Sequence, residues 1–524
     1  MFSPTYDEFK RLAQRGNLIP IVREVLADLE TPVSAFLKLR EGWDNTSSTQ
    51  SRIQTSTRSA TRTPAFLLES VEGGENIARY SFLGVGAKLE IITKDNVATI
   101  RENGEETSVE LSHARDPLHL VEEIMARYTF VPRAGLPRFC GGMVGFLGYD
   151  LVRFFENLPN APHDDRNLPD CHLLLTDTLL VFDNVRHSII VLNNAHVENH
   201  DENALRAAYE LACEKINDTL HKLESETKTA RFLPIESTSS TRSSDEMPRS
   251  NFATRDDFQN AVTRCIEYIH AGDCVQVVPS QRFEVPLSAS TFGVYRALRH
   301  VNPSPYMFYL ELGEATLIGA SPEILVTEDG RRVTTRPLAG TRRRGTSPQE
   351  DATLEAELLA DPKDRSEHIM LVDLHRNDIG RVCDFGSVEV DELMVVEKYS
   401  HVMHIVSNVV GKLREDKTSF DLLRASFPAG TLSGAPKVRA MQIIDELEPT
   451  RRGPYGGAIG YFSFSGNLDT CITLRTIVVK DDIAYVQAGG GVVADSVPAD
   501  EYEETCNKAR AALRAIALAE SAES

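Results

Sequence analysis

The sequence predicts an α+β fold with mixed or antiparallel sheets rather than a doubly wound fold. Residues 173–183 and 188–194 alternate in apolar character as strands do, and no helical pattern separates them. Strand patterns also outnumber strand–helix–strand units along the chain. In addition, no glycine-rich segment fits a dinucleotide-binding or P-loop pattern, which disfavours nucleotide binding.

The remaining elements are expected from apolar periodicity and from the residues that begin and end helices. A Gly272-Asp273 turn separates a helix from a strand, and Pro362 breaks a helical stretch. In chain order the expected elements are helix 204–223, helix 256–271, strand 274–283, helices from 352 and over 364–374, strand 402–410, a helix after Pro436, strands 471–479 and 483–487, and a final helix after Pro498.

One domain boundary is visible in the composition. A chain of 524 residues with 41% hydrophobic content is long enough for two or three domains. Residues 234–249 are rich in Ser, Thr and Pro, as in a linker or an exposed loop. They divide the chain into an N-terminal domain, 1–235, and a C-terminal domain, 250–524. A second polar stretch, 45–63, is interpreted as a loop insertion.

Charge and cysteine usage narrow the class of protein. The formal net charge is -21 and no basic stripe stands out, which argues against a nucleic-acid or anionic-membrane partner. The eight cysteines have no C-x-x-C spacing and suit reduced thiols better than a disulfide framework. No apolar run reaches a membrane-spanning length, and the N-terminal residues lack a signal-peptide core. The sequence therefore predicts a soluble cytoplasmic protein.

Two acidic pairs are candidate metal ligands. Asp364 and Glu367 are three residues apart, as are Glu501 and Glu504, so each pair lies on one face of its expected helix. Four carboxylates in one pocket would repel each other unless a cation lies between them. Mg²⁺ is the natural candidate, because it takes one or two protein carboxylates and adds water and substrate oxygens. Spacing alone leaves open the alternative of a solvated helix face.

Several residues are suited to an anionic ligand. The run Gly489–Gly491 follows an expected strand and lets backbone approach a ligand closely, although a structural turn is the simpler explanation of the run by itself. Arg475 lies in the expected strand CITLRTIVV, where its charge faces either solvent or an anion. Tyr455 stands in the turn GPYGG as a hydroxyl donor. Lys508 is four residues after Glu504 and is expected to neutralise it.

Seven segments of the chain carry a family resemblance: LLES (67–70), NPSPYMFY (302–309), RPLAGTRRRG (336–345), EHIMLVDLHRNDIGRV (367–382), PAGTLSGAPKVRAM (428–441), GPYGGAIGYF (453–462) and AGGGVVADSVPADEYEETCNK (488–508). The likeness covers essentially all of residues 255–515. The chain thereby resembles chorismate-utilising enzymes, and among them the large subunits of anthranilate synthases. This resemblance implies an anthranilate-synthase-like fold, in which the sheets form a β-sandwich core flanked by helices.

The resemblance implies metal and substrate contacts. Glu367 and Glu504 match Mg²⁺ ligands, and Asp364 and Glu501 match acidic residues behind them. The metal would hold the ring carboxylate of chorismate. The positions that match chorismate contacts are Gly340, Thr341, Tyr455, Arg475, Gly489, Gly490, Gly491 and Lys508.

The resemblance also implies a lyase reaction, the first step of tryptophan synthesis. Ammonia adds at C2 of chorismate, the C4 hydroxyl leaves, and pyruvate is eliminated to give anthranilate. Glu323 matches the proposed general acid, His404 matches a histidine near the departing hydroxyl, and Gln276 and Thr431 match further catalytic positions. A general acid here requires a raised pKa. From pattern alone, Glu323 is a surface carboxylate at a strand end and His404 is a core histidine.

Two positions separate the chain from related activities. Relatives that add water to chorismate carry a lysine base where this chain has Gln276, and an amide cannot remove a proton from water. Aminodeoxychorismate synthases carry a nucleophilic lysine where it has Ala339, which disfavours that alternative. A tryptophan-binding protein without chemistry is a third possibility. It is disfavoured because every metal, anion and acid position is filled.

The resemblance further implies feedback inhibition by L-tryptophan and a partner subunit. Inhibition from a separate site requires two conformations with different affinities. No cysteine stands in a G-x-C-x-G setting, so use of glutamine requires a separate glutamine amidotransferase subunit that supplies ammonia. The residues that match the tryptophan site are Glu69, Ser70, Asn302, Pro305, Tyr306, Met307 and Phe308.

Overall fold

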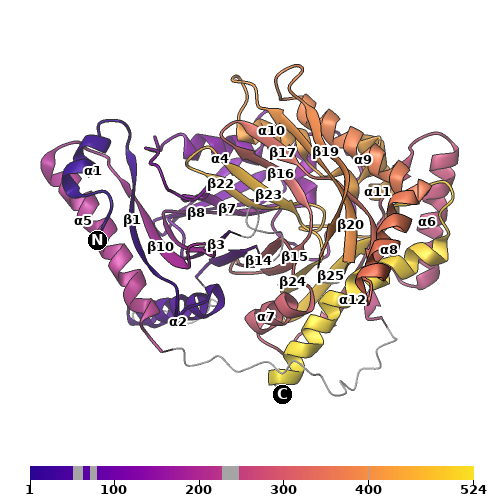
Figure 1. Cartoon of the computed structure of the whole chain (residues 1–524), viewed down its shortest axis with the longest axis horizontal. Coiled ribbons are helices and arrows are strands. Elements are labelled where there is room, and N and C mark those ends of the chain that lie inside the picture. The colour runs from indigo at the N-terminus through magenta and orange to yellow at the C-terminus, as the bar shows by residue number, and fades with distance from the viewer. Residues whose placement is uncertain (51–62, 71–78, 227–246, 400–401, 524) are drawn as a thin grey trace.

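The computed structural model describes residues 1–50, 63–70, 79–226, 247–399 and 402–523. Two large sheets stack at the centre of the molecule, and helices cover their outer faces (Figure 1). Neighbouring strands in both sheets pair antiparallel throughout the described residues. The predicted α+β fold with a β-sandwich core flanked by helices is therefore confirmed.

The first sheet has 11 strands and changes from N-terminal to C-terminal strands where β2 pairs with β14. In order across this sheet the strands are β1 (Leu18–Leu26), β10 (Ser188–His196), β9 (Thr178–Asp183), β3 (Tyr80–Val85), β2 (Ala65–Glu69), β14 (Tyr306–Glu311), β15 (Thr316–Ser321), β24 (Thr476–Lys480), β25 (Ile483–Gly489), β13 (Ser280–Pro286) and β11 (Arg249–Ser250).

The second sheet has 12 strands and makes the same change where β22 pairs with β7. Its strands in order are β18 (Leu338–Arg343), β20 (Val402–Lys412), β17 (Arg332–Thr335), β16 (Ile324–Asp329), β23 (Leu468–Ile472), β22 (Ala458–Ser463), β7 (Gly142–Leu147), β8 (Cys171–Thr176), β4 (Leu89–Lys94), β5 (Val97–Glu102) and β6 (Glu105–Glu110), with β19 (Glu389–Lys398) also paired to β20. Both sheets thus take strands from both predicted domains, and the division into 1–235 and 250–524 stays a prediction.

Helices pack on the outer face of each sheet. The first sheet is covered by α1 (Tyr6–Leu12), α2 (Pro32–Gln50), α5 (Glu202–Leu223), α7 (Thr291–Val301) and α12 (Pro498–Glu523). The second is covered by α4 (Pro117–Met125), α9 (Pro362–Gly380), α10 (Ser419–Ser426) and α11 (Lys437–Leu447), while α8 (Pro348–Ala360) packs on β20 and α6 (Arg255–His270) on α11. No helix in the described ranges is long and apolar enough to cross a membrane.

Strand alternation explains why both faces of the first sheet are apolar. On β14, Phe308 and Leu310 join the hydrophobic cluster between the sheets, whereas Met307 and Tyr309 join the cluster beneath the helices. Successive side chains of a strand point to opposite faces, so one continuous apolar run serves both layers. This packing places the start of β14, which carries Tyr306, at a rim of the sandwich interior.

Some of the expected elements differ from the structure. Segment 173–183 forms two strands, β8 and β9, because the chain passes from the second sheet to the first at Asp177. Segment 274–283 also divides, because Pro279 has no N–H to donate to a strand ladder. Its first part, β12 (Gln276–Val277), pairs with β21 (Gly434–Ala435) in a separate small sheet.

The expected loop insertion at 45–63 is wrong in its first part, since α2 continues to Gln50. Residues 51–62 lie outside the described residues, as does the predicted linker up to residue 246. The expected helices 204–223 and 256–271 and the final helix correspond to α5, α6 and α12. All eight cysteines are free thiols.

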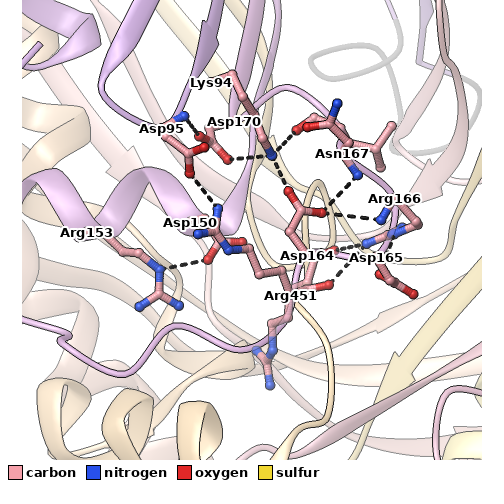
Figure 2. Close-up of polar contacts among 12 residues, drawn as sticks. Lys94, Asp95, Asp150, Arg153, Asp164, Asp165, Arg166, Asn167, Asp170 and Arg451 are labelled. Atoms are coloured by element: carbon pink, nitrogen blue, oxygen red, sulfur yellow. Dashed lines mark hydrogen bonds and ion pairs between the residues drawn. The ribbon is translucent and has the colours of Figure 1, made fainter.

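A polar network joins the two halves of the chain (Figure 2). Arg451, in the segment after α11, donates to Asp95 Oδ1 at 3.0 Å. The Asp95 N–H donates to Asp170 at 2.6 Å, and Lys94 Nζ lies 3.9 Å from the same carboxylate. Burial raises the pKa of Asp170 to about 6. The turn between β4 and β5 is thereby attached to the C-terminal half.

Candidate active site

The residues expected at the active site converge where helices α9 and α12 pack against strands of different sheets. Helix α9 packs against β18 and β20, and α12 packs against β25. Gln276 Nε2 donates to Glu367 Oε1 of α9 at 3.1 Å. On the other side, Lys508 Nζ of α12 donates to the carbonyl of Gly489 at 2.9 Å. The end of β25 and the small β12–β21 sheet therefore lie between the two acidic helices.

The two acidic pairs lie on either side of the glycine run. A Cβ added at Gly490 would lie 2.8 Å from Glu501 Oε2 and 3.7 Å from Glu504 Oε1. One added at Gly491 would lie 3.6 Å from Glu367 Oε1. Burial raises the pKa of Glu367, and the nearby charge of Glu504 raises it further. The carboxylates of α9 and α12 thus share one electrostatic environment, and glycine leaves the space between them open.

The donor set fits a magnesium ion. Glu501 Oε2 is buried and has no hydrogen-bond partner in the described part of the chain. Asp364 is held by Arg342 at 3.0 Å, and Glu504 by Lys508 at 2.7 Å. Across the described ranges, no three His, Cys, Asp or Glu side chains are grouped closely enough to hold a metal by themselves. Mg²⁺ suits such a site, because it needs few protein carboxylates and keeps positions for water and substrate oxygens.

Glu323 is a buried acid in the short connection between β15 and β16. Its exposed fraction is 6%, so it is not the surface carboxylate that pattern alone suggests. Burial raises its pKa to about 8, against the opposing effects of Thr431 and Arg475. Thr431 Oγ1 and Glu323 Oε1 are both buried, and neither makes a hydrogen bond of ordinary geometry within the described residues. Glu323 is therefore protonated at neutral pH and has an oxygen free for a ligand.

His404 lies on β20 and is held from β18. Its Nδ1 lies 3.0 Å from the Gly340 carbonyl oxygen and 3.0 Å from Thr341 Oγ1. A carbonyl oxygen only accepts, so Nδ1 carries the proton and Nε2 keeps its lone pair. Burial lowers the pKa of His404 to about 4, and the charge of Arg475 acts in the same direction. The imidazole is therefore neutral at physiological pH.

Gly340 satisfies a backbone requirement at this point. Its φ of 63° is in the left-handed region that glycine favours. A Cβ at this position would lie 2.9 Å from Leu358 Cδ1 and 3.1 Å from Asp364 Cγ. Glycine thus allows β18 to approach α9 closely while its carbonyl holds His404.

Arg475 does not lie within a strand, contrary to the expectation for CITLRTIVV. Strand β23 ends at Ile472 and β24 begins at Thr476, and Arg475 between them has a φ of 48°. This left-handed conformation interrupts the extended backbone and takes the side chain out of the strand ladder. Burial lowers the pKa of the guanidinium, which has no hydrogen bond or ion pair among the described residues. Such a cation is suited to an anionic ligand.

Tyr455 and the glycine run complete this side of the site. Tyr455 is 6% exposed, and a Cβ at Gly489 would lie 2.9 Å from its hydroxyl oxygen. Burial raises the pKa of Tyr455, so its hydroxyl remains a donor. The N–H of Gly490 donates to the Pro279 carbonyl at 3.2 Å. That N–H is already used within the protein and is not free to donate to a ligand.

Sequence reasoning missed two residues that shape the site. Arg342 holds Asp364, but the run of three arginines at 342–344 gives no sign of which one faces the acidic helix. Arg452 is 2% exposed beside Tyr455, and it pairs with Glu448 at 2.6 Å. Its spacing of four from Glu448 is a helical signal, yet the chain leaves α11 before Glu448.

Six of the seven residues expected at the inhibitor site line a separate cavity of about 810 Å³. Strand pairing places Met307 opposite Glu69, and Ser70 follows directly. Ser70 Oγ and Asn302 Nδ2 are buried and unpartnered within the described residues. Asn302 is the one that does not line this cavity. The Glu69 carboxylate is held by the Tyr295 hydroxyl and by Arg299 at 3.2 Å. The unpartnered Ser70 hydroxyl is therefore available to a ligand there.

The chain matches the model of a protein family described as chorismate binding enzyme over residues 63–514. Component 1 of anthranilate synthase from Acetivibrio thermocellus is 49% identical over 98% of this chain and 99% of that protein. The corresponding protein of Pseudomonas aeruginosa is 47% identical over 98% of this chain and 99% of its own length. A crystal structure of anthranilate synthase component I from Streptococcus pneumoniae has a TM-score of 0.73 and 34% identity, over 93% of this chain and 98% of that one. Escherichia coli MenF, at 18% identity and a TM-score of 0.64, shares the fold.

These similarities define the class of protein: the chain belongs to the chorismate binding enzyme family. Within that family its relatives at 42–49% identity, over nearly their full lengths, are component 1 of anthranilate synthase, and the chain is an enzyme of this kind. The resemblance found in the sequence is thus confirmed. The alternative of an aminodeoxychorismate synthase is not favoured.

Proposed function

We propose that this chain converts chorismate and ammonia to anthranilate and pyruvate in a reaction that depends on Mg²⁺. The observation that supports it best is the position of Glu323, a buried acid with a pKa of about 8 near Arg475, a cation that is unpaired within the described residues. Glu323 supplies a proton for a poor leaving group, and Arg475 holds an anion. Glu323 also lies in the electrostatic range of Lys508, on the helix that carries Glu501 and Glu504.

In this proposal the substrate is held by both of its carboxylates. Arg475 and Tyr455 bind one of them, and Glu367 and Glu504 would hold the Mg²⁺ ion that the other carboxylate would bind. When bound, the metal ion offsets the charge of the substrate carboxylate as elimination proceeds. Gln276 fixes the orientation of Glu367 through its amide and leaves the carboxylate its charge.

Two groups are proposed to act on the departing hydroxyl. Glu323 donates a proton to the C4 oxygen, which leaves as water while ammonia adds at C2. His404 is neutral and presents its Nε2 lone pair, so it positions the hydroxyl without placing a second positive charge beside Arg475. Gln276 cannot act as a base toward water, which leaves ammonia as the nucleophile.

We further propose a cytoplasmic enzyme that receives ammonia from a glutamine amidotransferase subunit and is inhibited by L-tryptophan. The relatives' designation as component 1 supports a second component. The cavity that contains Ser70, Pro305 and Tyr306 supports the inhibitor site, since it combines apolar and charged side chains with a buried hydroxyl that has no partner within the described residues.

The direct test is anthranilate fluorescence from the purified chain with chorismate, an ammonium salt and Mg²⁺. We expect product, loss of product with a chelator, and recovery with added Mg²⁺. Glutamine in place of ammonium is expected to give product only when the partner subunit is present. Absence of anthranilate from a folded chain that binds chorismate would contradict the proposed reaction.

A further inference from the structure

Three polar side chains lie between the 810 Å³ cavity and the active site. Arg336 and Glu397 line that cavity together with the residues of the proposed inhibitor site. They also line an adjoining hollow of about 20 Å³, whose walls include Tyr306 and Tyr399. The proposed inhibitor site and Tyr399 thus approach the same ion pair.

The contacts among these side chains form a short chain. Arg336 Nη2 donates to Glu397 Oε1 at 2.6 Å. The Tyr399 hydroxyl donates to the other oxygen of the same carboxylate, Oε2, at 2.7 Å. Hydrogen bonds to an ionised group are strong and short, so Glu397 fixes both partners at once. Any movement of Arg336 that turns the carboxylate also alters the hydrogen bond of Tyr399.

This series of side-chain contacts ends at His404. The Tyr399 ring centroid lies 5.8 Å from that of the imidazole. Glu397 is paired directly with His404 across the β19–β20 ladder. Arg336 stands two residues before β18, the strand whose Gly340 carbonyl holds His404 Nδ1. The placement of His404 therefore depends on Arg336, Glu397 and Tyr399. They act on it through side-chain contacts and through the strands β18 and β19 on either side of it.

We propose that Arg336, Glu397 and Tyr399 are positioning residues that couple occupancy of the cavity to the placement of His404. This inference rests on the proposed tryptophan site. An amino acid in the cavity brings a carboxylate and an ammonium group, and each competes for one member of the Arg336–Glu397 pair. Glu392, at 3.6 Å from Arg336, offers the guanidinium a second carboxylate. Loss of the hydrogen bond to Glu397 lets the Tyr399 ring shift, and this alters its packing against His404.

The variant that tests this inference is Tyr399→Phe, which removes the hydroxyl and keeps the ring. Tryptophan binding is measured by calorimetry without chorismate, and kcat and KM for chorismate are measured with and without tryptophan. We expect tryptophan affinity within about twofold of the unaltered chain and a fall in kcat at unchanged KM. The fraction of activity that survives saturating tryptophan is expected to rise about fivefold.

Two further variants separate this role from a general structural one. Glu397→Gln keeps the shape of the side chain and weakens both hydrogen bonds, so its effect is expected to match that of Tyr399→Phe, and the double variant to be no worse than either. Tyr268→Phe removes a tyrosine–glutamate hydrogen bond of 2.6 Å at the exposed Glu446 and is expected to change neither inhibition nor kcat.

The outcomes distinguish the two proposals. If the unaltered chain does not bind tryptophan, the proposed inhibitor site is wrong, and the proposed coupling role is rejected as well. If tryptophan binds all variants and inhibits Tyr399→Phe and Glu397→Gln as fully as the unaltered chain, the coupling role alone is overturned. A rise in residual activity that Tyr268→Phe shares would equally overturn it.

Discussion

The side-chain amide of Gln276 donates a hydrogen bond to Glu367 Oε1 at 3.1 Å, which joins the small β12–β21 sheet to the acidic face of α9. Gln276 is 2% exposed, so this contact is made away from solvent. An amide orients a carboxylate without neutralising it. In the proposed mechanism this position therefore orients a metal ligand and, because it lacks a base, favours ammonia over water as the nucleophile.

Gln276→Lys is expected to raise the Mg²⁺ concentration needed for half-maximal activity about tenfold, because an ammonium group would neutralise Glu367. Water-dependent chemistry is expected to appear only if the pocket tolerates the buried charge. Anthranilate and hydroxylated products are followed by chromatography over a Mg²⁺ titration. Gln276→Met, which has similar length and no charge, separates loss of the hydrogen bond from gain of the cation. Unchanged anthranilate output from the lysine variant would count against a role for this position.

The pH dependence of kcat/KM is expected to report Glu323. Its pKa is raised to about 8, so the acid form is present below that pH and is lost as pH rises through it. Activity is therefore expected to fall about tenfold per pH unit above that value. Glu323→Gln is expected to lower kcat by at least about a hundredfold and to abolish this fall in activity at alkaline pH, the alkaline limb of the pH profile.

Glu328→Gln is the matched control for Glu323. Glu328 is also a buried glutamate whose pKa burial raises, but it accepts a hydrogen bond from Ser419 at the far end of β16. This variant is expected to keep both kcat and the alkaline limb. An alkaline limb that persists in Glu323→Gln would assign it to another group.

Removal of one carboxylate on α12 is expected to affect metal binding selectively. Glu504→Gln should weaken Mg²⁺ binding by at least about tenfold, measured by calorimetry in the presence of chorismate. Glu503→Gln alters the adjacent residue, which pairs with Arg255 at 3.2 Å outside the site. Equal Mg²⁺ affinity in the two variants would remove Glu504 from the ligand set.

Ser70→Phe is expected to leave catalysis largely intact and to desensitise the enzyme to tryptophan, because the larger side chain fills the cavity that Ser70 lines. Ser70→Ala removes the unpartnered hydroxyl without filling that space and should weaken inhibition less. Inhibition curves for anthranilate formation provide the measurement. Full tryptophan inhibition of Ser70→Phe would place the inhibitor elsewhere.

The sequence predicts local features of this fold well, where the cause lies in neighbouring residues. Pro498 begins α12 as expected, and the spacing of Glu501 and Glu504 places both on the side that faces Gly490. The division of 173–183 into β8 and β9 was not predictable, because an apolar run looks the same whether its two parts join one sheet or two.

Long-range features of the site could not be predicted from the sequence, because they depend on residues that are far apart in it. The pKa of Glu323 depends on burial and on the opposing effects of Thr431 and Arg475, which are far away in the chain. The left-handed φ of Arg475 interrupts a segment whose composition is that of a strand. The pairing of Glu397 with His404 depends on a β19–β20 register that two irregularities shift, and no local pattern reveals such shifts.

The ladders β2–β14 and β7–β22 cross between the two halves inside both sheets. A chain cut between α5 and α6 would therefore remain a single folded particle, held by backbone hydrogen bonds in two separate layers. Either fragment alone would instead expose two long, apolar strand edges to solvent, and such edges promote aggregation. Exchange of one half for that of a distant relative thus requires four strand edges to match at once.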